Sequence, residues 1–172
     1  MTALLAGAIA LGANLGEPRR TLAGTRRSVG ARLQRWGCQD LSWSRLWRTQ
    51  PVGPPQPAYL NAAVTFAAPA SLDAALLLAF LLDEERAYGR VRLERWGPRT
   101  LDLDLLYLGE TRLQTLDLTL PHPRAHERAF VLWPLLDADP GAVLPGHGAV
   151  APLARALGQT GVEPLTAVGE PW

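Results

Sequence analysis

The stretch ERWGPRTLDLDLLYLG, from Glu94 to Gly109, determines how the rest of the chain is interpreted. Its second half alternates leucine with aspartate, a pattern typical of a strand with one apolar face and one polar face. Asp102 and Asp104 then share a face, with Cα atoms roughly 6–7 Å apart at a rise of ~3.3 Å per residue. Carboxylates at that spacing suit a pair of magnesium ions about 3.5–4 Å apart. Taken alone, the pattern is more often the solvated face of a half-buried sheet.

An arginine-rich loop precedes this strand, with Arg90, Arg92, Arg95 and Arg99 within ten residues and Trp96 among them. Guanidinium groups bind phosphate in a bidentate manner, and a loop that closes over a nucleotide excludes water from the reaction. The sequence therefore predicts a phosphate clamp, with a solvated loop as the alternative. The chain contains no lysine, and this excludes a P-loop as the phosphate site.

The composition indicates one globular domain over residues 1–172, because 48% of the residues are hydrophobic and 19% are charged. A net charge of +1 argues against a general nucleic-acid coat. The single cysteine, Cys38, cannot form an internal disulfide and favours a reducing compartment. No apolar run approaches the ~18–20 residues that span a bilayer. We therefore expect a cytoplasmic protein with neither a membrane nor a nucleic acid as partner.

The periodicity of apolar residues predicts the order strand, helix, strand, strand, helix, strand. The expected elements are a strand over residues 4–11, a helix over 18–36, strands over 41–47 and 59–66, a helix capped by Ser71 that continues to Tyr88, and the aspartate strand. A stiff proline-rich loop over residues 49–57 joins the second and third strands. This order is that of a ferredoxin-like split βαβ sandwich (βαββαβ), an α+β fold. The remaining residues form a C-terminal appendage, with a short strand over 118–120, helices over 127–136 and 152–157, and a strand over 162–168.

A sheet of this kind carries its helices on one face and leaves the other face open. The leucines would meet the helices, while Tyr59, Asn61, Asp102 and Asp104 would project together from the open face. An aromatic ring, an amide and two carboxylates have no reason to gather on an apolar core. The open face is therefore the candidate site. The backbone of His122 is held extended between two prolines. Its side chain could donate a hydrogen bond to a phosphate, or it could simply be a surface residue.

Four motifs occur along the chain in a fixed order: GANLG, TQPVGPPQPAYLNAAV, GRVR followed by ERWGPRTLDLDLLYLG, and LPHPRAHERAFVLWPL. Together they resemble the 6-hydroxymethyl-7,8-dihydropterin pyrophosphokinases over residues 4–136. The resemblance implies an enzyme of folate synthesis that moves the β,γ-pyrophosphoryl group of ATP onto the pterin hydroxymethyl group and leaves AMP. It also implies two Mg²⁺ ions, with ATP and 6-hydroxymethyl-7,8-dihydropterin as partners, and we expect a monomer.

The resemblance further implies a role for individual positions. Asp102 and Asp104 match the magnesium-binding aspartates, and Arg90 and Arg99 match the arginines placed for phosphoryl transfer. The pterin-binding positions are Thr49, Val52, Tyr59, Asn61 and Phe130. The ATP-binding positions are Glu85, Arg92, Trp96, Leu105, Thr119, His122 and Arg128. The chain departs from the family pattern at Leu82 and Asp117, where some members carry a glutamine and an arginine near ATP.

Two other functions remain open at this point. A split βαβ sheet with an exposed aromatic and a basic loop could bind single-stranded RNA, although the two aspartates would repel its phosphates. A different two-metal nucleotidyl transferase would share the aspartates but gives no reason for a pterin-sized aromatic sandwich.

Overall fold

The computed structural model describes residues 3–90 and 96–172, so Arg92 and Arg95 of the expected clamp lie outside the described residues. The elements are β1 (Leu4–Ala13), α1 (Pro18–Arg35), β2 (Gln39–Trp43), β3 (Trp47–Thr49), β4 (Tyr59–Pro69), α2 (Ala74–Ala87), β5 (Asp102–Leu108), β6 (Leu113–Gln114), β7 (Thr119–Leu120), the short 3-10 helix Ala125–Glu127, α3 (Ala129–Ala138), β8 (Val143–Leu144), β9 (Gly148–Ala149), α4 (Val150–Leu157) and β10 (Val162–Pro164).

A six-stranded sheet forms the centre of the molecule, in the order β10-β3-β4-β1-β5, with β2 also paired to β4. Every pairing within it is antiparallel. Mixed helices and an antiparallel sheet confirm the predicted α+β class. The two long central strands, β1 and β4, run side by side over their whole length.

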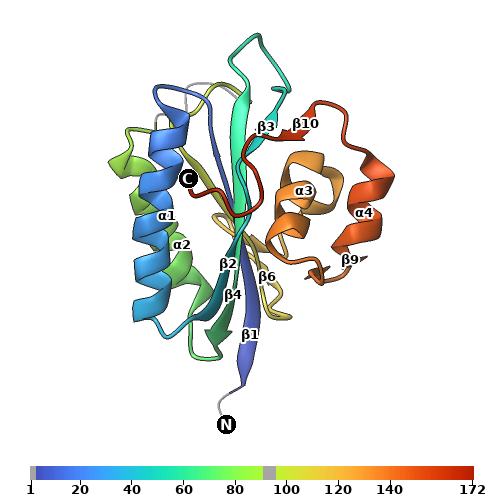
Figure 1. The fold of residues 1–172 in the computed structure, drawn as a ribbon. Coiled ribbons are helices and arrows are strands. Elements are labelled where there is room, and N and C mark those ends of the chain that lie inside the picture. Colours follow the sequence, from blue (N-terminus) through green and yellow to red (C-terminus); the bar gives the residue numbers. More distant parts are fainter. Residues whose placement is uncertain (1–2, 91–95) are drawn as a thin grey trace.

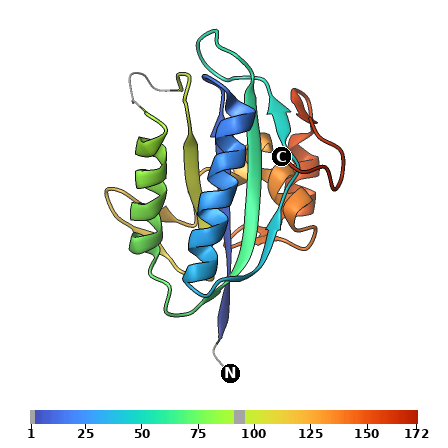
Figure 2. The same ribbon diagram turned by 60° about the vertical axis from the view of Figure 1, so that its left-hand side comes forward.

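One face of the sheet is covered by α1 and α2, as Figures 1 and 2 show from two sides. The buried side chains on this face include Ile9 of β1, Val64 of β4 and Leu103 of β5, packed with Leu22 of α1 and Leu77 of α2. Fully burying an aliphatic side chain of this size stabilises the fold by about 1.5–3 kcal/mol. The predicted meeting of the leucine face with these helices is confirmed.

The opposite face is not open, and that expectation was wrong. Figure 1 shows α3 and α4 on the far side of the sheet from α1 and α2. Leu132 of α3 packs there with Ala8, Ala63 and Leu106 in a second cluster of buried residues. The alanines of β1 and β4 leave room for a helix to approach the sheet closely. The strand pattern alone does not distinguish small side chains that face solvent from small side chains that admit a helix.

Two predicted boundaries were also wrong. The expected strand over residues 41–47 is divided into β2 and β3, because the backbone N–H of Arg45 donates to Asp137 Oδ2 at 2.7 Å instead of continuing along β2. The cap of α2 is Asp73 rather than Ser71. Asp73 Oδ1 accepts hydrogen bonds from the backbone N–H groups of Ala75 (2.6 Å) and Leu76 (3.3 Å), and these are two of the donors that a helix start leaves unpaired.

The C-terminal residues are tied to both layers. β10 pairs with β3 and so lengthens the main sheet. Farther on, the indole Nε1 of Trp172 donates to the carbonyl of Ser44 at 2.8 Å. The Arg26 guanidinium of α1 lies over the Trp172 ring, 4.8 Å from its centroid. These residues therefore contact α1 as well as the sheet edge.

Candidate active site

The candidate site lies at the end of the sheet where β1 ends and β5 begins. In β1, Gly12 is paired with Asn61 of β4 on one side and with Asp102 of β5 on the other. Directly paired residues of antiparallel strands point to the same face, so the amide and the carboxylate share a face, as does Asp104 opposite Ala10. A Cβ at position 12 would lie 2.8 Å from Asn61 Nδ2. Glycine is required there because any side chain would displace the amide.

Asp102 is bound by two arginines. Its Oδ1 lies 2.8 Å from Arg90 Nη1, and its Oδ2 lies 2.9 Å from Arg99 Nη1. Arg90 is also ion-paired with Glu85, a buried residue that accepts a hydrogen bond from the backbone N–H of Leu103 at 2.8 Å. Charges of alternating sign thus run from Glu85 through Arg90 and Asp102 to Arg99. Such a network fixes the orientation of each guanidinium group.

Glu85 reaches this network from the core side of α2. Leu77, Leu81 and Glu85 are the buried residues of that helix, and their spacing of four residues places them on one helical face. The side chain of Arg90 is only 6% exposed, and its Nε is buried without a hydrogen-bond partner among the described residues. An unpartnered buried donor is costly, and such groups are retained mainly where they have a functional role.

Asp104 differs from Asp102 in having no arginine bound to it among the described residues. Burial, together with the neighbouring negative charge of Asp102, raises the pKa of Asp104 to about 7. His122 Nε2 lies 3.9 Å from Asp104 Oδ2. Burial, with Arg128 nearby, lowers the pKa of His122 to about 4, so the imidazole is neutral at pH 7. Its Nδ1 accepts from the backbone N–H of Arg124 at 3.2 Å, which leaves the proton on Nε2, facing Asp104.

The two aspartates fit a magnesium site that is completed by a substrate. Among residues 3–90 and 96–172, no group of three or more His, Cys, Asp or Glu side chains could hold a metal ion. Mg²⁺ is commonly held by one or two carboxylates together with the phosphates of a nucleotide rather than by a cage made only of protein. Burial and the charge of Asp102 both disfavour the ionised form of Asp104, and a bound divalent cation would favour that form.

The amide of Asn61 is oriented by its neighbours on β3 and β1. Thr49 Oγ1 donates to Asn61 Oδ1 at 2.7 Å, and Asn61 Nδ2 points to the carbonyl of Leu11 at 3.5 Å. Tyr59, on the same face of β4, donates its hydroxyl to the carbonyl of Gly97 at 2.9 Å. Burial raises the pKa of the Tyr59 phenol. Tyr59 therefore connects the sheet to the loop that carries Arg99.

Asn14 is a buried residue that sequence reasoning did not select. Its Nδ2 donates to Gln56 Oε1 (3.0 Å) and to the carbonyl of Pro57 (2.9 Å), and its Oδ1 accepts from the backbone N–H of Arg99 (2.8 Å). One side chain thus joins the end of β1, the proline-rich loop and the arginine loop. The available signal was an asparagine within the turn sequence GANLG, which indicates a turn but not partners 42 and 85 residues away.

The other predicted positions are more dispersed. Val52 is 65% exposed in the proline-rich loop, and Trp96 is 44% exposed, with Arg124 Cζ 5.9 Å from its ring centroid. Phe130 lies in the first turn of α3, with Arg128 Cζ 5.7 Å from its ring centroid. Two further positions belong to β7 and to the core: Thr119 lies on the short strand β7, and Leu105 is buried on the α1/α2 face of β5, opposite the aspartates.

Comparison with solved structures defines the class of fold first. A structure of an HPPK-DHPS protein in complex with substrates aligns with 90% of this chain at a TM-score of 0.62 and 10% sequence identity. The HPPK-DHPS of Plasmodium falciparum, in wild-type form with pterin and p-hydroxybenzoate, aligns at 0.56 and 12% identity, again over 90% of this chain. The present chain covers 43% of the length of each of those chains. At such low identity, the likeness concerns the fold.

Sequence comparison then gives the family. The model of the 7,8-dihydro-6-hydroxymethylpterin-pyrophosphokinase (HPPK) family matches residues 8–140. A 2-amino-4-hydroxy-6-hydroxymethyldihydropteridine pyrophosphokinase of Synechocystis is 42% identical over 144 residues, which are 81% of this chain and 69% of that protein. The protein of the same name from Pseudomonas aeruginosa is 39% identical over 162 residues, 91% of this chain and 94% of its own. The chain belongs to the HPPK family and is a pyrophosphokinase, which decides against the RNA-binding alternative.

Proposed function

We propose that the chain transfers the pyrophosphoryl group of ATP to the hydroxymethyl group of 6-hydroxymethyl-7,8-dihydropterin in folate biosynthesis, leaving AMP. Beyond family membership, the observation that supports this proposal is the gathering of Asp102, Asp104, two arginines and Asn61 at one end of the sheet. Phosphoryl-type transfer depends on positioning and charge neutralisation more than on covalent chemistry. A cationic and metal-binding face beside an oriented amide supplies both requirements.

The arginines would stabilise the negative charge of the transferring group. Arg90 is held from behind by Glu85, so its guanidinium is oriented before ATP arrives, and preorganised donors cost little reorganisation during the reaction. Arg99 is 26% exposed and is held mainly through its backbone by Asn14, which leaves its side chain free to exchange Asp102 for a phosphate. Arg92 lies outside the described residues, and its contact with ATP remains a prediction.

Two magnesium ions on Asp102 and Asp104 would neutralise charge on the β- and γ-phosphates. Tyr59 and Phe130 are proposed to stack on the two sides of the pterin ring, with Asn61, Thr49 and the backbone near Val52 reading its amide-like edge. ATP would be contacted by the remaining positions, which are Glu85, Trp96, Leu105, Thr119, His122 and Arg128. At Glu85 and Leu105, where the side chains are buried, such a contact requires the backbone or a local rearrangement.

We also propose the finer description of the fold and state. The elements β1 to β5 with α1 and α2 form a ferredoxin-like split βαβ unit, to which residues 109–172 are added within a single domain over residues 1–172. No helix in the described part of the chain has the length and apolarity needed to cross a membrane. The enzyme is proposed to act as a cytoplasmic monomer, which sedimentation at micromolar concentration would test.

Measuring the nucleotide product tests the proposed reaction. The protein is incubated with ATP and Mg²⁺, with and without 6-hydroxymethyl-7,8-dihydropterin, and AMP and ADP are separated by chromatography. Pterin-dependent AMP without ADP is the expected result. ADP in place of AMP would mean transfer of a single phosphoryl group. No product from a folded protein that binds ATP would mean a different acceptor.

A further inference from the structure

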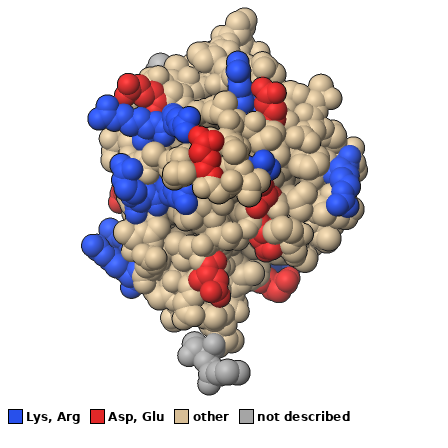
Figure 3. Space-filling model, viewed as in Figure 1, with Lys and Arg blue, Asp and Glu red and all other residues tan. Residues whose placement is uncertain are grey.

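The outer surface of α1 is strongly basic. The helix carries six arginines and no acidic residue: Arg19, Arg20, Arg26, Arg27, Arg32 and Arg35. Figure 3 shows basic side chains gathered on this side of the molecule. The arginines differ in what they contact, and that difference separates structural residues from residues with unused donors.

Most of these arginines already have partners. Arg26 lies over the rings of Trp43 and Trp172, and Arg32 lies over those of Trp36 and Phe80. Arg19 is ion-paired with Glu170 at 3.1 Å. By contrast, Arg27 makes no hydrogen bond, ion pair or ring contact with any other residue that the structure describes.

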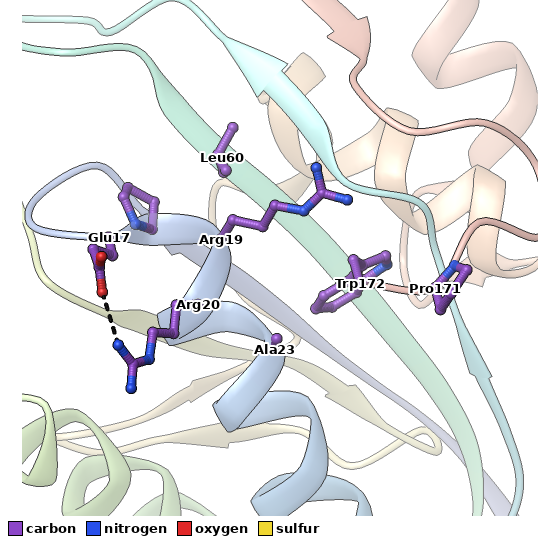
Figure 4. Close-up of a pocket in the computed structure, with 8 residues that line it drawn as sticks. Glu17, Arg19, Arg20, Ala23, Leu60, Pro171 and Trp172 are labelled. Carbon is purple, nitrogen blue, oxygen red and sulfur yellow. Dashed lines mark hydrogen bonds and ion pairs between the residues drawn. The ribbon is translucent and has the colours of Figure 1, made fainter.

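Two cavities adjoin the N-terminal half of α1. The larger, of about 500 Å³, lies between α1 and the C-terminal residues. Figure 4 shows Arg19 extending toward Trp172 in it, while Arg20 turns away toward Glu17 and α2. Because Arg19 is already neutralised by Glu170, this cavity offers little unpaired charge.

The smaller cavity lies between α1 and the end of α2. Its volume is about 310 Å³, and it is lined by Glu17, Arg20, Thr21, Gly24, Arg27 and Tyr88. Two of its donors, the Tyr88 hydroxyl and the Arg27 guanidinium group, lie close to Gly24. A Cβ built at that glycine would lie 2.4 Å from the Tyr88 hydroxyl and 3.8 Å from Arg27 Nη2. Glycine at this position therefore leaves room for the phenol hydroxyl, which a Cβ would displace.

The donors of this cavity have unused capacity. The Tyr88 hydroxyl, like Arg27, makes no hydrogen bond with another described residue. Arg20 is paired only with Glu17 among the described residues, at 3.3 Å, and the two side chains are 85% and 74% exposed. An ion pair so exposed contributes at most about 1 kcal/mol, so an anion can compete with the Glu17 carboxylate for Arg20. With the Thr21 hydroxyl, the cavity offers two guanidinium groups and two hydroxyls, and guanidinium groups bind phosphate in a bidentate manner.

We propose that this cavity is a second anion site, separate from the active site, which binds the phosphate group of a small phosphorylated solute between Arg20, Arg27 and Tyr88. A volume of about 310 Å³ is at the lower limit of small-molecule pockets and exceeds what one phosphate fills. The ligand is therefore a phosphate ester with a small organic part rather than a nucleic-acid backbone, which would need a longer basic track.

The position of Tyr88 links this site to the catalytic arginine. Tyr88 is the C-cap residue of α2, and Arg90 follows two residues later. The guanidinium group of Arg90 is ion-paired with Glu85 of α2 and with Asp102 of β5. An anion that fixes Tyr88 against Gly24 thus restrains the peptide segment that carries Arg90. Anion binding in this cavity then changes the affinity for ATP if the segment that carries Arg90 takes different positions in the ligand-free and the nucleotide-bound protein.

The test is a titration of the isotope-labelled full chain with inorganic phosphate, at constant ionic strength, followed by ¹H–¹⁵N spectra. We expect the amide signals of Gly24 and Tyr88 to shift in a saturable manner. Arg27→Gln should weaken binding at this site roughly tenfold, or about 1.4 kcal/mol, because a charged donor is lost. Tyr88→Phe, which keeps the ring on Gly24, should weaken it about fivefold, because the donor lost there is neutral. Glu17→Gln should tighten it, because a competing carboxylate is removed.

Arg35→Gln is the matched control, since Arg35 lies on the same helix outside the cavity and makes no described contact. If Arg35→Gln weakens the response as much as Arg27→Gln, the effect is general electrostatics and the proposal fails. It also fails if phosphate shifts only residues at the active site, such as Gly97 and Leu103, or if chloride at the same ionic strength shifts Gly24 equally. Glucose 6-phosphate in place of phosphate tests the ester: binding no tighter than that of phosphate would reject the organic part.

Discussion

The two faces of β5 arise from one alternating sequence, but one face packs in the core and the other lines the candidate site. Leu103 and Leu105 point to α1 and α2 and are at most 4% exposed. Asp102 and Asp104 point the other way, with side chains 25% and 34% exposed. On the leucine face, the protein itself supplies every partner. On the aspartate face, Asp102 is neutralised by arginines, whereas Asp104 has an unfavourable carboxylate charge that a ligand must compensate. A face left electrostatically incomplete is the mark of a site.

The largest effect is expected where the charge is least compensated. Asp104→Asn should lower turnover by 10³-fold or more, because it removes one of the two carboxylates that are proposed to bind Mg²⁺. The free energy of unfolding should not fall and should rise at neutral pH and above, since the amide is nearly isosteric and the lost carboxylate charge was unfavourable in the folded state. Steady-state AMP formation and urea unfolding measure the two quantities. Asp40→Asn, an exposed aspartate on β2, is the control; wild-type turnover in Asp104→Asn would refute the assigned role.

The opposite face should give the reverse result. Leu103→Ala leaves a cavity under α1 and α2 and should cost about 2–5 kcal/mol of unfolding free energy. Turnover of the fraction that remains folded should stay within about threefold of the wild type, because the side chain points away from the site. Leu116→Ala, at a fully exposed leucine, is the control and should cost less than about 0.5 kcal/mol. A Leu103→Ala protein of normal stability would show that the core assignment is mistaken.

A smaller effect is expected for the arginine that shares Asp102. Arg99→Ala should lower the rate of transfer by roughly 10²–10³-fold, as removal of a single transition-state donor does. The dissociation constant of the pterin should change less than threefold, because Arg99 is not among the proposed pterin contacts. Rapid-quench kinetics and fluorescence titration separate the two. Arg48→Ala, on the exposed side of β3, is the control, and a normal rate with poor pterin binding would contradict the role given to Arg99.

The smallest effect is expected when a surface ion pair that contacts neither face of β5 is removed. Arg86 and Asp83 are paired at 2.6 Å on α2, with side chains 71% and 70% exposed. Arg86→Ala should change the unfolding free energy by no more than about 0.5 kcal/mol and leave turnover unchanged. A loss of several kcal/mol in thermal or urea unfolding would show that surface charge on α2 matters more than its exposure implies.

The sequence predicted the parts of this comparison that depend on local alternation. The faces of β4 and β5 follow from a period of two residues, and α1 begins at Pro18 and ends before Gly37 as expected. Features made by distant residues were missed. The division of β2 from β3 depends on Asp137, 92 residues from Arg45. The second face of the sheet is covered because α3 packs on the alanines of β1 and β4. The role of Asn14 depends on its hydrogen bonds to two loops.

Within the site, the sequence predicts which residues share a face of the sheet, but it does not predict the network of ion pairs that connects them. That Asn61 and the aspartates share a face follows from the strand pattern. That Glu85 holds Arg90 from the core side does not, because a glutamate on an apolar helix face looks like a misplaced charge until its partner is known. The structure thus gives Glu85 a second role beside the proposed contact with ATP, which is to hold the guanidinium group of Arg90.

The most direct test of the difference between the two faces is magnesium binding in the presence of a non-hydrolysable ATP analogue, measured by equilibrium dialysis on the wild type, Asp104→Asn and Leu103→Ala. The account predicts two ions bound per chain in the wild type and in folded Leu103→Ala, and at most one in Asp104→Asn. Two ions bound with equal affinity in all three proteins would contradict it, because the aspartate face would then not be where the metal is held.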